Sequence, residues 1–251
     1  MHTLQLSKEN EAKVMVDLNK RSDQFIFRFL SIYSVFGIFI SFYYDTWLIG
    51  LSTAALAMAS WFVLKALLPN ASLHRYVASG FFGVFVGTFI YQMHGLFEMH
   101  FFAFIGSAIL IVYQDWKYQI PLITFVVVHH AVFAFLQYTG VPDIYFTQLE
   151  YMDLQTFIYH ASLALAVVIV CGYWAHHFRE LTMSNAIQSI ELKKKVKMTA
   201  QLNKQLNEAS AKLKTKNAEL EDNKAKLLSL TEKQAAMYQK LREDAETKKA
   251  F

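Results

Sequence analysis

The stretch YQMHGLFEMHFF, residues 91–102, places two histidines and a glutamate between two long apolar segments. Titratable side chains inside hydrocarbon cost free energy, so a group of them within apolar sequence is by default a functional-site hypothesis. Three more histidines, His129, His130 and His160, lie within later apolar segments. Several imidazoles with one carboxylate are the ligands that a transition-metal ion or haem iron uses in proteins.

The composition is that of a membrane protein. Hydrophobic residues make up 55% of the 251 residues, and nearly all charge lies before Arg28 and after Arg179. Between these points run apolar segments of roughly 18–25 residues, the length that crosses ~30 Å of hydrocarbon as a helix. The charged N-terminus has no apolar core and is not a secretory signal peptide. The single cysteine, Cys171, excludes an internal disulfide.

Six apolar segments, separated by short turns, predict six membrane helices. They span residues 25–44, 47–68, 76–93, 97–113, 120–138 and 157–174. We therefore predict an all-α fold, a six-transmembrane-helix bundle continued by a long cytoplasmic coiled-coil helix. The expected domains are an N-terminal lead-in (1–22), a six-span membrane domain (23–178) and a coiled-coil helix (179–251).

Charge placement predicts the orientation of these helices. Six crossings put both termini on one side of the membrane. The basic residues fall on that side: those of the lead-in, of the 65–75 turn and of the tail, together with Lys117. Asp45 and the acidic loop that holds Asp143, Glu150 and Asp153 fall on the other side. By the positive-inside rule, both termini are cytoplasmic.

The C-terminal tail contains no Pro or Gly after Gly172 and is rich in helix-forming residues, so it should extend the last membrane helix into the cytoplasm. Leucines recur every seven residues at Leu206, Leu213, Leu220 and Leu227, a spacing that predicts a coiled coil. Polar residues such as Asn223 at the partner position weaken this seam and are typical of a parallel dimer. The alternative is a solvated helix with no partner. Acidic residues interspersed among the lysines argue against a nucleic-acid partner.

The predicted topology decides which polar residues can share one site. The corner at His94 falls on the outer side, so the next segment begins there, and the outer ends of the last four segments can converge in a bundle. The candidate ligands in the outer half of the bilayer are His94, Glu98, His100, His129, His130 and His160. Asp115 lies about 22 Å along the helix from His100, at the inner face, and is excluded.

Helix geometry limits these candidates further. His129 and His130 point about 100° apart on a helix, so only one of them is expected to face the site directly. Glu98 and His100 are two residues apart and do not share a face of a regular helix. They converge if Glu98 belongs to an irregular corner, which Gly95 permits.

The identity of the bound group stays open. Imidazoles with one carboxylate suit zinc, iron, copper or nickel, and two opposed histidines suit haem b. No Cys-x-x-Cys-His motif for covalent haem is present. Met93 and Met99 are either copper ligands or packing residues. His74, His176 and His177 lie at the cytoplasmic boundary and are expected to be interfacial.

Four sequence pieces within residues 76–165 form a combined pattern. They are Met-His-Gly-x-x-Glu-x-His-Phe, Tyr113-x-Asp115-Trp116, His129-His130-x-x-Phe133 and His160-Ala161. This pattern resembles the histidine-rich multi-span sensor region that precedes the signalling parts of some bacterial chemoreceptors, histidine kinases and diguanylate cyclases. The resemblance implies the input domain of a bacterial inner-membrane signalling protein. No kinase, cyclase or adaptor-binding hairpin follows, so we expect a separate or missing output module, or the coiled coil itself as output.

Three classes of function follow from these features. The leading hypothesis is a homodimeric, non-catalytic sensor in which a metal or haem site controls the cytoplasmic helices. The alternative is a membrane di-iron-type oxidoreductase, similar to a desaturase or hydroxylase, although the ligands are few for two irons. A purely structural membrane protein is the third, and it leaves the polar residues unexplained.

Overall fold

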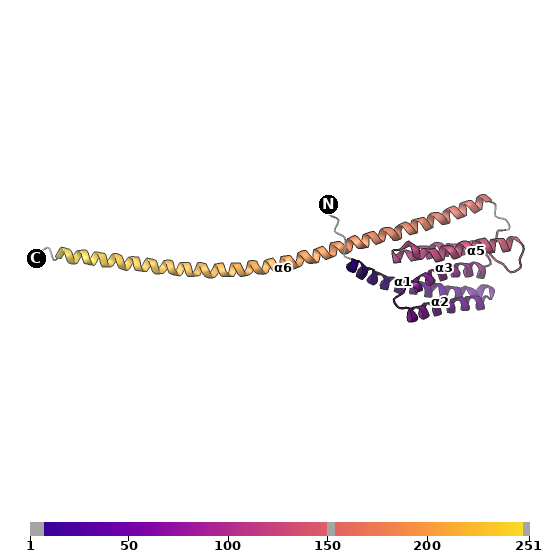
Figure 1. Ribbon diagram of the computed structural model, residues 1–251, viewed down its shortest axis with the longest axis horizontal. Helices are drawn as coiled ribbons and strands as arrows, with labels where there is room; N and C mark the ends of the chain where they lie inside the picture. The colour runs from indigo at the N-terminus through magenta and orange to yellow at the C-terminus, as the bar shows by residue number, and fades with distance from the viewer. Residues whose placement is uncertain (1–7, 150–153, 248–251) are drawn as a thin grey trace. The chain divides into compact units, whose positions relative to one another are not determined.

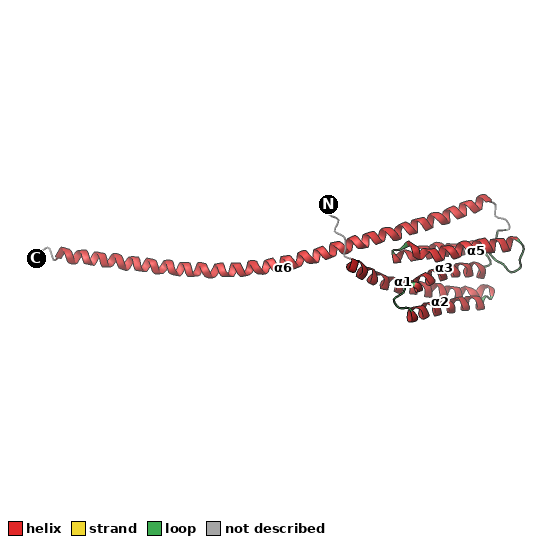
Figure 2. Cartoon of the chain, viewed as in Figure 1, coloured by secondary structure: helices red, strands yellow, loops and turns green. Residues whose placement is uncertain are grey.

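The computed structural model describes residues 8–149 and 154–247. Within these ranges every regular element is a helix, which confirms the all-α prediction (Figure 2). In chain order the α-helices and short 3-10 helices (η) are α1 (Lys8–Tyr44), α2 (Trp47–Leu67), α3 (Leu73–Gln92), η1 (Phe97–His100), α4 (Phe101–Leu110), η2 (Ile111–Tyr113), η3 (Trp116–Gln119), α5 (Ile120–Tyr138) and α6 (Leu154–Thr247).

Five helical stretches of the described chain are long and apolar enough to cross a membrane: α1, α2, α3, η3 with α5, and α6. The fourth predicted span is the shorter stretch Phe97–Tyr113, in which one 3-10 turn precedes α4 and another follows it. Because 3-10 turns rise about 2.0 Å per residue, this stretch still measures roughly 29 Å, close to the hydrocarbon thickness. The six-span arrangement stays a prediction.

The first helix begins earlier in the chain than the predicted first segment. α1 begins at Lys8, so residues 8–22 of the predicted lead-in continue directly into the first apolar segment. Glu150 and Asp153 of the predicted acidic loop lie outside the described residues. The chain divides into two compact units, Met1–Ile187 and Gln188–Phe251.

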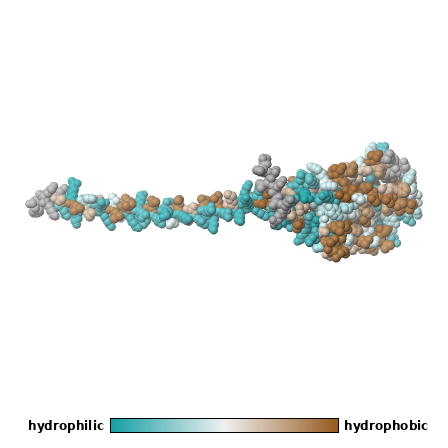
Figure 3. Space-filling view, in the orientation of Figure 1, coloured by the Kyte–Doolittle hydropathy of each residue, from teal (hydrophilic) through white to brown (hydrophobic). Residues whose placement is uncertain are grey.

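α3 is the central helix of the first unit, packed against α1, α2, α4 and α5 (Figure 1). Its buried face carries Phe82, Phe85 and Phe89, whose rings surround Tyr33 of α1 at centroid distances of 4.9, 6.0 and 5.7 Å. The Tyr33 hydroxyl donates to the carbonyl of Phe102 at 3.0 Å, so its one polar atom is satisfied. Apolar side chains cover much of the outer surface of this unit, as expected for contact with lipid (Figure 3).

At the end of α3 near the predicted corner, one amide ties three helices together. The Gln92 side chain donates to the Gly37 carbonyl at 2.9 Å, to Ser41 Oγ at 2.8 Å and to Thr46 Oγ1 at 3.2 Å. Gly50 of α2 lies against the same contacts, since a Cβ there would come within 2.8 Å of the Gly37 carbonyl oxygen. The absence of a side chain at Gly50 therefore lets α2 approach α1.

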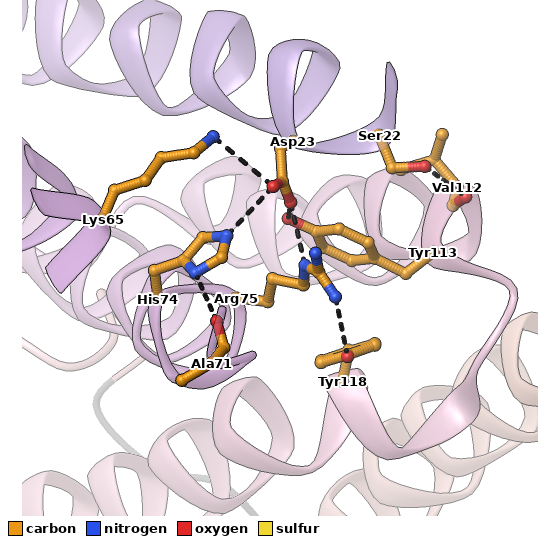
Figure 4. A network of polar contacts seen from close by, with 9 residues as sticks. All are labelled: Ser22, Asp23, Lys65, Ala71, His74, Arg75, Val112, Tyr113 and Tyr118. Atoms are coloured by element: carbon orange, nitrogen blue, oxygen red, sulfur yellow. Dashed lines mark hydrogen bonds and ion pairs between the residues drawn. The ribbon is translucent and has the colours of Figure 1, made fainter. Parts of the chain in front are cut away.

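The opposite end of the bundle is held by Asp23, a buried carboxylate of α1 (Figure 4). Its oxygens accept hydrogen bonds from His74 Nε2 at 3.0 Å, Arg75 Nε at 2.9 Å and the Tyr113 hydroxyl at 3.2 Å. Lys65 Nζ lies 3.4 Å from the same group. Asp23 thereby joins α1, α2, α3 and η2.

His74, which is expected at the cytoplasmic boundary, is buried between helices, with a side chain that is only 2% exposed. Its second ring nitrogen, Nδ1, lies 3.1 Å from the Ala71 carbonyl oxygen. Both nitrogens therefore face acceptors, and both hydrogen bonds form together only when the ring carries two protons. His74 thus links Asp23 of α1 to the backbone just before α3.

The Asp23→Asn substitution tests this network. It leaves the buried donors of His74 and Arg75 without an anion, which costs about 3 kcal/mol. We expect a lower midpoint of thermal unfolding in lipid nanodiscs. Asp17→Asn, an exposed position on the same helix, is the matched control and should unfold like the parent protein. Equal midpoints for the two variants would contradict the structural role of Asp23.

Candidate functional site

Three histidines from three helices meet at one place in the first unit. His100 ends η1 at the start of α4, His130 lies in α5 and His160 lies near the start of α6. Their ring centres are 5.2 Å apart for His100 and His130, 6.0 Å for His100 and His160, and 6.0 Å for His130 and His160. We call these residues the histidine triangle.

Hydrogen bonds to the backbone orient two of the three rings. Nδ1 of His100 lies 3.1 Å from the Phe97 carbonyl oxygen, and Nδ1 of His130 lies 2.8 Å from the Val126 carbonyl oxygen. A carbonyl oxygen only accepts, so these nitrogens carry the protons, and Nε2 of each neutral ring keeps a free lone pair. Metal-binding histidines typically donate their other N–H to such an acceptor.

His129 faces a different neighbour from His130, as the helix geometry predicts. Its ring stacks on Phe133 at 4.3 Å, and a Cβ added to Gly87 of α3 would lie 2.8 Å from its Cδ2. Within the described part of the chain its Nδ1 is buried without a hydrogen-bond partner. The ring centre of His129 is 5.7 Å from that of His130. His129 therefore lies beside the triangle, on the side of α5 that faces α3.

The structure does not bring His94 or Glu98 to the triangle. The His94 ring lies between Tyr44 and Tyr145, with ring centres 3.8 and 4.0 Å away. Glu98 belongs to η1, where residues two apart point about 120° away from each other, and its side chain is exposed. Among the described residues, no group of three or more His, Cys, Asp or Glu is placed so that it could hold a metal ion.

The loop after α5 covers the triangle with one aromatic ring. Phe146, which is 6% exposed, has its ring centre 5.0 Å from His130 and 5.6 Å from His100. Gln137 fixes this loop: its Oε1 accepts from the backbone N–H of Phe146 at 2.7 Å and of Thr147 at 3.0 Å, and its Nε2 donates to the Thr147 carbonyl at 2.8 Å.

The irregular corner after α3 completes the attachment of this loop. His94 and Gly95 both have positive φ, at 49° and 76°. A Cβ on Gly95 would lie 2.7 Å from the carbonyl carbon of Thr147, so only glycine allows the corner and the loop to meet so closely.

A cavity of about 540 Å³ adjoins the triangle between α4, α5 and α6. Its polar lining residues are the three histidines and Ser107, whose hydroxyl already donates to Gln119 Oε1 at 2.7 Å. The other lining residues are Ala, Val, Leu, Ile and Phe, with alanines on all three helices. Acidic and basic side chains are absent from this lining in the described residues.

Asp115, which the predicted topology places away from the site, caps η3 by accepting from the backbone N–H of Lys117 at 3.1 Å.

Comparisons with protein-family models, with curated proteins and with solved structures find no match for this chain. The function must therefore be argued from the geometry.

The sequence pattern does not identify Phe146, Gln137 or Asp23 as parts of these networks. Phe146 is one of many phenylalanines in the chain, and Gln137 is a single amide at the end of an apolar run. Asp23 carries a recognisable signal, because an acidic residue that directly precedes an apolar segment requires a partner when it is buried.

Replacing Gln137 tests the attachment of the loop. Gln137→Leu removes the acceptor for two backbone N–H groups, so hydrogen exchange at Phe146 and Thr147 should quicken about tenfold. Gln148→Leu changes an exposed glutamine of the same loop and is the matched control. Mass-spectrometric hydrogen exchange in nanodiscs measures the difference. If exchange at these two amides were unchanged in Gln137→Leu, Gln137 would not hold Phe146 on the histidines.

Proposed function

We propose that this protein is a transmembrane sensor in which the histidine triangle binds one transition-metal ion (iron, copper or zinc) or haem b. The observation that carries the proposal is the meeting of imidazoles from three helices, two of them with a free Nε2 lone pair. In the proposed orientation the site lies in the outer half of a bacterial inner membrane and both termini are cytoplasmic.

The spacing of two of the three rings suits a single ion. An ion bonded to two imidazoles at ~2.0–2.1 Å with a tetrahedral angle holds their ring centres roughly 5 Å apart. His100 and His130 have this spacing already, at 5.2 Å, whereas His160 lies 6.0 Å from each. Three imidazoles suit one ion better than the two irons of a desaturase-like enzyme, so a non-catalytic sensor is the favoured function.

Ion binding at this site would act on α6. His160 would have to approach the other two rings by roughly 1 Å to complete the site. Further along α6, Ala175 is fully buried, and a Cβ on Gly172 would lie 3.6 Å from Cβ of Trp116. The start of α6 can therefore move while its later turns stay in contact with the bundle. Such a shift, with two arrangements of different affinity for the ion, is the element that a switch requires.

α6 is one unbroken helix from Leu154 to Thr247, so it connects the proposed site to the C-terminal unit. In this unit Leu206, Leu213, Leu220 and Leu227 are 65–66% exposed at heptad spacing. A parallel homodimer would bury this row of leucines. Within the helix, Lys216 pairs with Glu219 and Lys226 pairs with Asp222, at 2.8 and 2.7 Å, which disfavours a nucleic-acid partner.

The resemblance to histidine-rich sensor regions of bacterial chemoreceptors, histidine kinases and diguanylate cyclases supports the same proposal. It adds the expectation that the dimeric helix acts on a downstream signalling module or protein.

Metal content after purification tests the site. The parent chain in nanodiscs should hold about one ion per chain, measured by elemental analysis, and the absorption spectrum distinguishes an ion from haem. His160→Ala should lower the affinity about a hundredfold, because it removes one of three ligands. His176→Ala, an exposed histidine of the same helix, is the control. The proposal would fail if the parent bound neither an ion nor haem, or if both variants bound as the parent does.

A further inference from the structure

A metal ion in the histidine triangle would lack a neutralising charge. Three neutral imidazoles leave the full double charge of a divalent ion in place, and no charged side chain lines the adjoining cavity within the described residues. The carboxylate that the sequence predicts for this role, Glu98, is exposed elsewhere. An uncompensated charge in such surroundings is costly, so the site requires an anion from another source.

The same ion would also keep an open coordination position. Three protein ligands with a free fourth position are typical of zinc sites that bind a further molecule. Phe146 packs on the His100 and His130 rings and is not part of the cavity lining. All three histidines line the cavity, so a ligand in the cavity would reach the open position.

The cavity is much larger than an ion and is elongated along the helices. On α5 its lining runs from Leu122 to Ala134, about 18 Å at 1.5 Å per residue, and His130 lies near one end of this range. On α6 the lining runs from Phe157 to Val168, again with the histidine near one end. Apart from Ser107, the long remainder is apolar, and a volume of about 540 Å³ suits one chain of a lipid-like molecule.

We infer that the triangle's ligand is a single-chain carboxylate dissolved in the bilayer. Its carboxylate oxygen occupies the open position and neutralises the ion, and its alkyl chain lies along Val126, Ala164 and Leu165. This inference rests on the proposed metal site and names the molecule that the site senses.

The experiment uses the full chain in nanodiscs loaded with Co²⁺, whose visible spectrum reports its ligands. Dodecanoate should change this spectrum and bind at least a hundredfold more tightly than acetate, which lacks the chain. The alcohol 1-dodecanol, which lacks the anion, should leave the spectrum unchanged. Ala164→Phe fills the cavity one turn from His160, so it should weaken dodecanoate binding at least tenfold while Co²⁺ affinity stays unchanged.

The outcomes separate the inference from the proposed function. If Co²⁺ binds but dodecanoate acts no better than acetate, or 1-dodecanol acts equally, the carboxylate inference is overturned and the metal site stands. If Co²⁺ does not bind in a manner that depends on His160, the proposed metal site falls, and the inference falls with it. The comparison of the three probes on the parent chain decides the inference even if Ala164→Phe does not fold.

Discussion

A polar group inside an apolar helix bundle must find its partner within the protein, because lipid offers none. Gln92 donates from its Nε2 to three acceptors, while its Oε1 is buried without a partner among the described residues. Asp23 accepts from three hydrogen-bond donors on neighbouring helices. In the histidine triangle the constraint is met only by half, since His100 and His130 satisfy one ring nitrogen each through a backbone carbonyl. In the proposed site, a bound ion would satisfy the remaining lone pair of each of these rings.

The sequence pattern predicts the helices well because apolar runs end at recognisable turns. Residues 120–138 were expected as one segment and form α5 with the same bounds, and α2 differs from its prediction by a single residue. The pattern fails where side-chain direction depends on irregular backbone. His94 and Glu98 lie at the corner with positive φ and in a 3-10 turn, and neither direction follows from periodicity. The burial of His74 does not follow from the pattern, because its partner Asp23 is distant in sequence.

The two polar networks lie at opposite ends of the bundle and differ in kind. The Asp23 network gathers Lys65, His74, Arg75 and Tyr113 around one carboxylate and joins α1, α2, α3 and η2, so it fixes the bundle. The triangle joins α4, α5 and α6 through rings that approach without bonding one another. In the proposed sensor, ligand energy would act on α6, the element that continues from the triangle to the C-terminal unit.

Crosslinking of the C-terminal helices tests most directly whether occupancy of the triangle reaches the dimer seam. A single cysteine at Leu213, introduced with Cys171→Ser, is oxidised in nanodiscs with and without added metal, and a cysteine at Ala218, off the seam, is the control. The account predicts a higher yield of disulfide dimer at 213 than at 218, and a yield at 213 that changes with metal in the parent but not with His160→Ala. A yield of disulfide dimer at 213 that does not change with metal, or that equals the yield at 218, would contradict the account.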